Sequence, residues 1–175
     1  FKLGCGMFVE ECHRAAEDFP DVTVDEVIVD TFAMRLLRDP QTFDVVVTTN
    51  MFGDILTDEA AGLVGGLGMA PGLCIGEGAI AMAQAAHGSA PDIAGRGIAN
   101  PFAMIESTRM MLDWLGRDRG VPEAVAAAAL MGRATVAALA KPETRTGDIR
   151  GTAGTAGMTD AIVNAIETET DHVLA

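Results

Sequence analysis

Three aspartates that each follow a hydrophobic run are the residues best suited to chemistry in this chain. Asp30 comes directly after the run of residues 21–29. Asp54 and Asp58 follow residues 43–49 and are four positions apart, so on a helix their carboxylates lie on one face and repel unless a cation lies between them. A few carboxylates completed by water and substrate suit Mg²⁺ or Mn²⁺. Helix caps and solvated first-turn acids are the alternatives, and the spacing alone leaves them open.

The loop of residues 87–101 is the second candidate site. It is dense in small and turn-forming residues, with an imidazole at His87 and a carboxylate at Asp92. Such a loop lets bare backbone approach a flat, polar ligand, because few side chains stand in the way. Together with the aspartates it suggests an enzyme that binds a dinucleotide and a divalent metal. A hydrogen-bonded loop histidine without a ligand and a simple turn aspartate are the alternatives.

The elements that must position these residues alternate between strand and helix. Helical spacing predicts helices over residues 6–18, 31–38 and 53–64. Runs rich in Val and Ile predict strands over residues 21–29 and 43–49. Two successive strand-then-helix units indicate parallel pairing and an α/β layer architecture.

The second half of the chain is predicted to be mainly helical. Residues 62–78 are rich in glycine and are interpreted as a tightly packed turn region, and residues 79–86 fit either strand or helix. Asn100 and Pro101 form a good helix start, with Gly116 placed to end that helix. Further helices are expected over residues 122–140 and from about Thr159, after a polar segment rich in glycine and threonine.

Composition excludes several classes of function. The net charge of −13 argues against nucleic acid, because phosphate backbones attract Lys and Arg. Apolar runs stay far below the roughly 20 residues of a membrane span, and no leader pattern is seen, so we expect a cytoplasmic protein with no membrane partner. The three cysteines lack C-x-x-C spacing, which makes a disulfide framework or a zinc site unexpected. No G-x-G-x-x-G is present, which argues against a Rossmann fold.

Two long motifs resemble one enzyme family. Residues 50–58, NMFGDILTD, resemble the metal motif of the isocitrate and isopropylmalate dehydrogenases. Residues 87–101, HGSAPDIAGRGIANP, resemble that family's cofactor loop almost letter for letter. The Val29-Asp30 pair, the GGLG segment at 65–68 and the helix containing residues 110–112 follow in the expected order. The resemblance spans essentially the whole chain.

The resemblance implies an α/β fold of the isocitrate/isopropylmalate dehydrogenase type, which is not a Rossmann fold, in a subunit that works as a homodimer with shared active sites. Residues 1–64 would belong to the smaller, dimer-forming domain and residues 65–175 to the larger, cofactor-binding domain. Asp54 and Asp58 would bind Mg²⁺ or Mn²⁺ in their own subunit, and Asp30 would reach into the partner's site. Asp30 and Asp54 would be the catalytic pair.

The same resemblance assigns the cofactor loop to NAD. Asp92 would accept hydrogen bonds from the adenosine ribose hydroxyls, and a carboxylate there repels the 2′-phosphate of NADP. Ile93, in place of a polar residue, supports the same choice. The implied cofactor-binding residues are His87, Gly88, Ser89, Ala90, Asp92, Ile93 and Asn100.

Length is the main departure from the family. On its motifs, Phe1 falls a few residues after the family's catalytic lysine, and the chain contains no tyrosine. We therefore expect the carboxyl-terminal half of the fold, incomplete because the amino-terminal half is absent, and inactive alone. The expected reaction is the NAD-dependent oxidative decarboxylation of a 2-hydroxy acid, a 3-substituted malate, with 3-isopropylmalate favoured and isocitrate next. A catalytically silent partner subunit that binds nucleotide and metal, or a truncated fragment, is the alternative.

Overall fold

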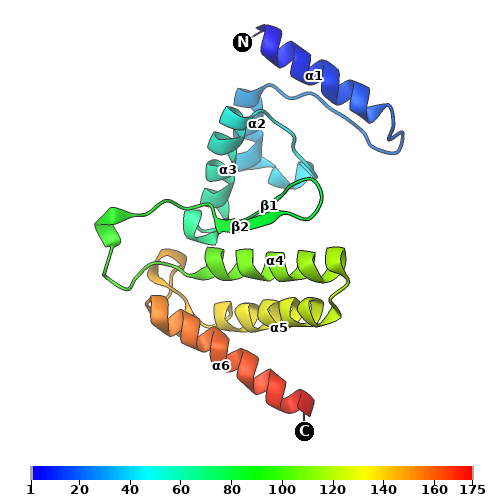
Figure 1. Ribbon diagram of the computed structural model, residues 1–175. Helices are drawn as coiled ribbons and strands as arrows, with labels where there is room; N and C mark the ends of the chain where they lie inside the picture. The colour runs from blue at the N-terminus through cyan, green and yellow to red at the C-terminus, as the bar shows by residue number, and fades with distance from the viewer. Residues whose placement is uncertain (1, 175) are drawn as a thin grey trace. The chain divides into compact units, whose positions relative to one another are not determined.

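The computed structural model describes the backbone of residues 2–174 and the side chains up to residue 169. The chain divides into two compact units, the first ending at Leu63 and the second beginning at Val64. Figure 1 shows its helices and strands, which are α1 (Lys2–Ala16), α2 (Val29–Arg38), α3 (Asn50–Val64), β1 (Pro71–Ile75), β2 (Ala81–Ala85), α4 (Phe102–Arg119), α5 (Pro122–Leu139) and α6 (Thr155–Leu174). Short 3₁₀ helices lie at Pro40–Thr42, Leu67–Met69, Pro91–Ile93, Pro142–Thr144 and Gly147–Ile149.

The first unit contains the three helices that the sequence predicts. Helices α1, α2 and α3 correspond to the predicted helices over 6–18, 31–38 and 53–64, with shifted ends. A small aromatic contact lies between α2 and the chain that follows it: the rings of Phe32 and Phe43 have centroids 4.6 Å apart. The guanidinium of Arg35 lies 4.9 Å from the centre of the Phe43 ring. This cluster fixes the end of α2 against the turn that follows it.

The two strands predicted for the first unit are absent from the residues that the structure describes. Residues 23–28 and 45–49 have no regular secondary structure. Val45 and Val47 are 82% and 68% exposed. A strand is stabilised mainly by hydrogen bonds and side-chain contacts with a neighbouring strand. Because neither run is paired with another described segment, the predicted strands and their parallel pairing are wrong for this chain.

A two-stranded sheet opens the second unit. Strands β1 and β2 pair antiparallel, with Pro71 opposite Ala85 and Ile75 opposite Ala81. The predicted turn region of residues 62–78 therefore contains a strand, which the glycines and the proline concealed because both are depleted in strands. The ambiguous residues 79–86 contain the partner strand. Helices and strands together make a mixed fold, and the sheet that the structure describes is antiparallel and lies in a region for which no strand pairing was predicted.

One buried serine joins this sheet to helix α4. The hydroxyl of Ser107, which is fully buried, accepts a hydrogen bond from the amide of Gly72 at 3.1 Å. Its proton lies within reach of the carbonyls of Gln84 (2.8 Å) and Ala103 (2.7 Å). The side chain thus satisfies backbone groups of β1 and β2, so the short sheet is held on the helix by polar contacts as well as by packing.

Helix α4 packs against α5, and α5 packs against α6 (Figure 1). Together these helices form the core of the second unit. Ala134, Ala138, Met158 and Ile162 form a buried cluster between α5 and α6. Small alanine side chains allow the helices to approach closely, and Met158 fills the remaining space. By length and composition α5 is long and apolar enough to cross a membrane, which the short apolar runs of the sequence did not predict; it packs against α4 and α6.

The ends of α4 differ from the prediction at one glycine. The helix does not stop at Gly116 but runs on to Arg119, and Gly120 ends it in the left-handed conformation, φ 66°. Gly116 is buried inside the helix, where an added Cβ would overlap Val125 Cγ2. Gly116 therefore allows α4 to approach the start of α5. A glycine in the sequence looks the same whether it ends a helix or permits close packing, so the sequence could not distinguish the two roles.

Candidate functional site

Asp30 lies in the first turn of α2, exposed to solvent. Its Oδ1 accepts hydrogen bonds from the amide of Thr31 at 2.5 Å and from the Thr31 hydroxyl at 3.2 Å. A carboxylate in the first turn is also favoured by the helix dipole. These contacts leave Oδ2 without a described hydrogen bond, so the carboxylate can still ligate a cation with that oxygen.

Asp54 and Asp58 lie one turn apart on α3, as their spacing predicts. Both are exposed, and neither carboxylate has a hydrogen bond or ion pair within the described part of the chain. Helix α3 contains no Lys or Arg, so nothing on it neutralises the two charges. Two free, hard oxygen donors on one helix face fit a divalent cation of the Mg²⁺ type, which takes one or two carboxylates and completes its shell with water and substrate oxygens.

The third aspartate does not join this pair. Among the described residues, no group of three or more His, Cys, Asp or Glu side chains is placed to hold a metal ion. Asp30 on α2 and the pair on α3 therefore do not form one cluster within the chain. The chain offers at most two of the three expected carboxylates at one point, and any third must come from elsewhere.

The beginning of the 87–101 loop presents polar groups on an open backbone. His87 and Asp92 are exposed, and Asp92 has no described partner. The His87 Nδ1 lies 2.8 Å from the carbonyl oxygen of Gly88. Because a carbonyl only accepts, Nδ1 carries the proton of a neutral ring and Nε2 is left as an acceptor. The site can therefore accept hydrogen bonds from a ligand at Nε2 and at the Asp92 carboxylate.

The backbone of this loop is strained at Ala90. It adopts the left-handed conformation at φ 43°, ψ 63°, immediately before the 3₁₀ turn Pro91–Ile93. Non-glycine residues reach this conformation at a cost of about 1–2 kcal/mol, and such strain clusters at ligand sites. The turn presents Asp92 at the surface and half-buries Ile93, while Gly88 and Ser89 remain exposed. These residues share one loop, as a common ligand would require.

The end of the loop is held by Asn100 and by a residue that the sequence analysis did not single out, Asp148. Helix α4 begins at Phe102 with Pro101 as its N-cap, one residue later than predicted, and Asn100 Oδ1 accepts a hydrogen bond from the Phe102 amide at 2.9 Å. Asn100 Nδ2 donates to Asp148 Oδ2 at 3.0 Å, 48 residues further along the chain. Glycines on both sides of Asp148, at 147 and 151, mark a tight turn in the sequence, but no pattern ties that turn to Asn100.

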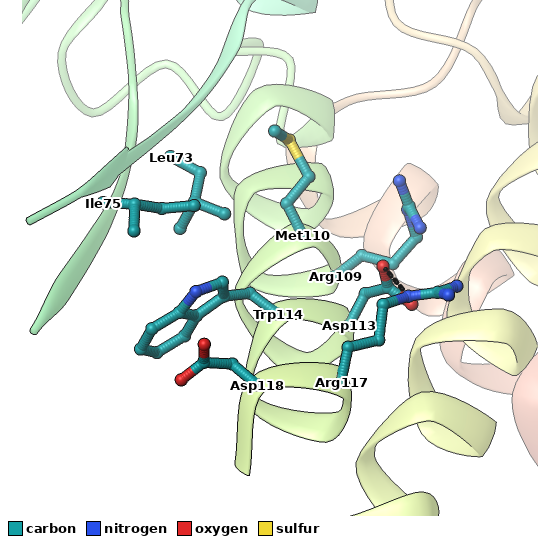
Figure 2. A pocket seen from close by; sticks show the side chains of 8 residues that line it. All are labelled: Leu73, Ile75, Arg109, Met110, Asp113, Trp114, Arg117 and Asp118. Carbon is teal, nitrogen blue, oxygen red and sulfur yellow. Dashed lines mark hydrogen bonds and ion pairs between the residues drawn. The ribbon is translucent and has the colours of Figure 1, made fainter. Parts of the chain in front are cut away.

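A hollow lies within the second unit (Figure 2). It measures about 540 Å³ and is formed by β1 and α4, with Leu73, Ile75, Met110 and Trp114 as its apolar lining. On its charged side, a hydrogen bond from Arg117 Nε to Asp113 Oδ2 (2.8 Å) lowers the pKa of the Asp113 carboxyl. None of the predicted site residues lines it. Its other two charged side chains pair with residues outside the lining, Arg109 with Glu106 and Asp118 with Arg119, so none of its charged groups is left unpaired.

Comparison with known proteins identifies the family of this chain. A sequence profile described as isocitrate/isopropylmalate dehydrogenase matches residues 4–165. An isocitrate/homoisocitrate dehydrogenase from Thermus thermophilus is 47% identical over 162 residues, which are 93% of this chain. The isocitrate dehydrogenase [NAD] catalytic subunit 5 of Arabidopsis thaliana is 42% identical over 157 residues, or 90% of the chain. The chain belongs to the isocitrate/isopropylmalate dehydrogenase family.

Structural similarity supports the same assignment. The crystal structure of isocitrate dehydrogenase from Methylococcus capsulatus superposes with a TM-score of 0.83 at 45% sequence identity, and covers 92% of this chain and 46% of that one. The curated relatives show the same proportion: the chain spans 46% of the Thermus protein and 40% of the Arabidopsis protein. The family, with its chemistry on CH–OH groups, is thus established over a chain that spans about half the length of its relatives.

Proposed function

We propose that this chain carries the metal-binding and nucleotide-binding part of an NAD-dependent dehydrogenase that oxidises and decarboxylates a 3-substituted malate. The observation that carries the proposal is the pair of free carboxylates on one face of α3, together with the open, strained loop that begins at His87. The family's name includes both isopropylmalate and isocitrate, so 3-isopropylmalate is the first substrate to test and isocitrate the second.

Asp54 and Asp58 would hold Mg²⁺ or Mn²⁺ through one oxygen each, leaving the other coordination positions to water and to the substrate. A divalent cation bound there supplies Lewis-acid stabilisation of the negative charge that develops on the substrate's oxygen. The exposure of both carboxylates lets a substrate approach them, and the absence of a basic residue on α3 keeps them free for it. Asp30, with Oδ2 free, would complete such a site from a second copy of the chain.

The 87–101 loop would bind NAD. His87 Nε2 can accept a hydrogen bond from an exocyclic amine, and the exposed Asp92 carboxylate can accept from both hydroxyls of a ribose. A 2′-phosphate would place a second negative charge beside Asp92, which favours NAD over NADP. Gly88, Ser89, Ala90, Ile93 and Asn100 would line the nucleotide with backbone and short side chains. The name of the Arabidopsis relative, which specifies NAD, supports this choice.

A chimeric enzyme tests the reaction directly. The segment that precedes the matched region in the Thermus relative is joined to this chain, and NADH formation is followed by its ultraviolet absorbance with 3-isopropylmalate or isocitrate and Mn²⁺. We expect turnover that stops on chelation with EDTA and falls at least about a thousandfold in Asp54→Asn, because a metal ligand is lost. Asp160→Asn removes an exposed carboxylate of α6 as the matched control. A folded chimera without turnover on either substrate, or turnover that survives EDTA, contradicts the proposal.

A further inference from the structure

A polar loop near the carboxyl end of the chain touches the candidate nucleotide loop at three points. Thr155 donates its backbone amide to the carbonyl of Gly97 at 2.8 Å and its hydroxyl to the carbonyl of Ala99 at 2.5 Å. Asp148 accepts from the side-chain amide of Asn100 at 3.0 Å. All three contacts link segments far apart in sequence and concentrate on residues 97–100. They join the end of the nucleotide loop to the 145–155 loop.

The 145–155 loop is itself fixed by backbone contacts. Thr146, fully buried, uses its carbonyl to accept from the amides of Ile149 (3.2 Å) and Gly151 (2.9 Å), and it forms an isolated parallel bridge with Ala153. At Gly151 an added Cβ would overlap the backbone carbonyl of Arg145. These contacts hold Asp148 and Thr155 in place, so their hydrogen bonds can fix the position of residues 97–100.

Close packing around Asn100 shows that its amide has one orientation. At Gly68 an added Cβ would lie 3.0 Å from Asn100 Cβ and 3.2 Å from Asp148 Oδ2, so a side chain there would press against both residues of the pair. The Asn100 amide oxygen accepts from the Phe102 amide, and its nitrogen donates to Asp148 Oδ2 and, at 3.4 Å, to Met69 Sδ. Sulfur is a weak acceptor, so without Asp148 the nitrogen would lose its stronger partner and residues 97–100 would lose one of their three contacts with the 145–155 loop.

We propose that Asp148 and Thr155 are positioning residues that hold residues 97–100 in the conformation that accepts the nucleotide. The inference rests on the proposed binding of NAD by this loop. Neither residue is expected to touch the nucleotide, and the negative charge of Asp148 does not favour a phosphate. What matters at position 148 is an acceptor for Asn100, so an amide can replace the carboxylate, and at position 155 a hydroxyl is required.

The test measures amide hydrogen exchange and NAD affinity on the 175-residue chain. In Asp148→Ala and Thr155→Val we expect amides of residues 97–101 to exchange about tenfold faster and the Kd for NAD to rise about tenfold, the size of effect that loss of one hydrogen bond allows. Asp148→Asn and Thr155→Ser, which keep the hydrogen-bonding group, should stay within about threefold of the unmodified chain in both measurements. Asp160→Ala, on the exposed face of α6, is the matched control.

The two measurements separate failure of the proposed function from failure of this inference. If the unmodified chain shows no heat of NAD binding in calorimetry, nucleotide binding by this chain is refuted and the positioning role with it. If NAD binds but Asp148→Ala leaves exchange at 97–101 and the Kd unchanged, only the positioning role is refuted. Equal losses in Asp148→Ala and Asp160→Ala would also overturn it, because a general loss of stability would then explain the effect.

Discussion

The two units of the chain differ in how much of their apolar surface they bury. In the second unit, Ala134, Ala138, Met158 and Ile162 form a shared core in which Ala134 and Met158 are wholly inaccessible. In the first unit, the described side chains that are well buried are Phe32, Leu56 and Ala61, while Leu3, Ile28 and Val45 are 88%, 74% and 82% exposed. The candidate metal ligands thus belong to the unit with little core, and the nucleotide loop belongs to the unit with its own core.

This difference explains which chemistry each unit can support by itself. A loop that accepts a flat ligand needs a rigid base, and packed helices with a pinned loop provide one. A pair of carboxylates on a helix needs only the helix, and the remaining ligands of a divalent cation would come from water, substrate or a second copy of the chain. The first unit leaves large apolar side chains such as Leu3, Ile28 and Val45 exposed, and the buried cluster between α5 and α6 has no counterpart among its described residues.

Met158→Ala should have the largest effect on stability and should show most clearly that the second unit depends on a buried core. Truncating this fully buried side chain leaves a cavity in the core between α5 and α6, and we expect a loss of about 3 kcal/mol in the free energy of unfolding. Met34→Ala, on the first unit where the side chain is 49% exposed, should cost less than about 0.5 kcal/mol. Urea unfolding followed by circular dichroism measures both. Equal losses would show that the second unit does not depend on this core.

A glycine pair tests the same contrast in the helices. Gly116→Ala should destabilise by about 2 kcal/mol, because its Cβ would overlap Val125 Cγ2 and lie 2.7 Å from the Val125 amide nitrogen. Gly6→Ala, in α1, meets no atom within 4 Å and should instead stabilise by about 0.8 kcal/mol through helix propensity. Thermal unfolding provides the measurement. A neutral Gly116→Ala variant would mean that α4 and α5 are not in close contact there.

Arg150 offers a smaller, stabilising change in the 145–155 loop. It ends the 3₁₀ helix Gly147–Ile149 in the left-handed conformation at φ 62°, where a side chain is unfavourable. Arg150→Gly should therefore raise the free energy of unfolding by about 0.5 kcal/mol, the strain removed less the chain entropy that glycine adds. Arg150→Ala keeps a Cβ and serves as the control. If alanine stabilises as much as glycine, the strain is not at the backbone.

The smallest effect concerns pH. The hydrogen bond from Arg117 lowers the pKa of Asp113 in the folded chain below its usual 3.8. A lowered folded-state pKa means that the pair's contribution is present above pH 3.8 and is lost as the pH falls through the lower folded value. In Asp113→Asn the pH-dependent contribution of the pair to the free energy of unfolding should be missing. The Tm of both proteins between about pH 5 and pH 2 tests it, and parallel curves would show that the pair makes no contribution. Asp113 and Arg117 lie at the surface, so the difference will be small.

Local patterns predicted the helices and the two motifs, because both depend on residues close together in sequence. Helices α2, α3 and α5 follow from apolar spacing and from Pro122, and the carboxylates of α3 fall on one face for the same reason. The strand predictions were wrong in two ways, with strands predicted where none form and a strand missed where one does. Residues 43–49 have strand composition but no partner, whereas β1 begins with a proline and a glycine and pairs with β2.

The long-range contacts of the nucleotide loop were beyond prediction from one sequence. Asp148 reaches Asn100 across 48 positions, and Gly116 faces Val125 in the next helix. Both contacts depend on how separate elements pack against one another, and residue type and local spacing carry no information about that packing. The resemblance to a family suggested candidate site residues, but the structure was required to identify the side chains that contact them, such as Asp148 at Asn100.

Binding of Mn²⁺ by the intact chain tests the central claim most directly. In a titration followed by electron paramagnetic resonance, the chain should remove free Mn²⁺ from solution, and the Asp54→Asn/Asp58→Asn double variant should bind at least about tenfold more weakly, because both carboxylate ligands are lost. The matched double variant Asp160→Asn/Glu167→Gln, which neutralises two exposed carboxylates on α6, should bind like the unmodified chain. If the two double variants bind Mn²⁺ equally well, the α3 carboxylates are not the metal ligands and the account is wrong.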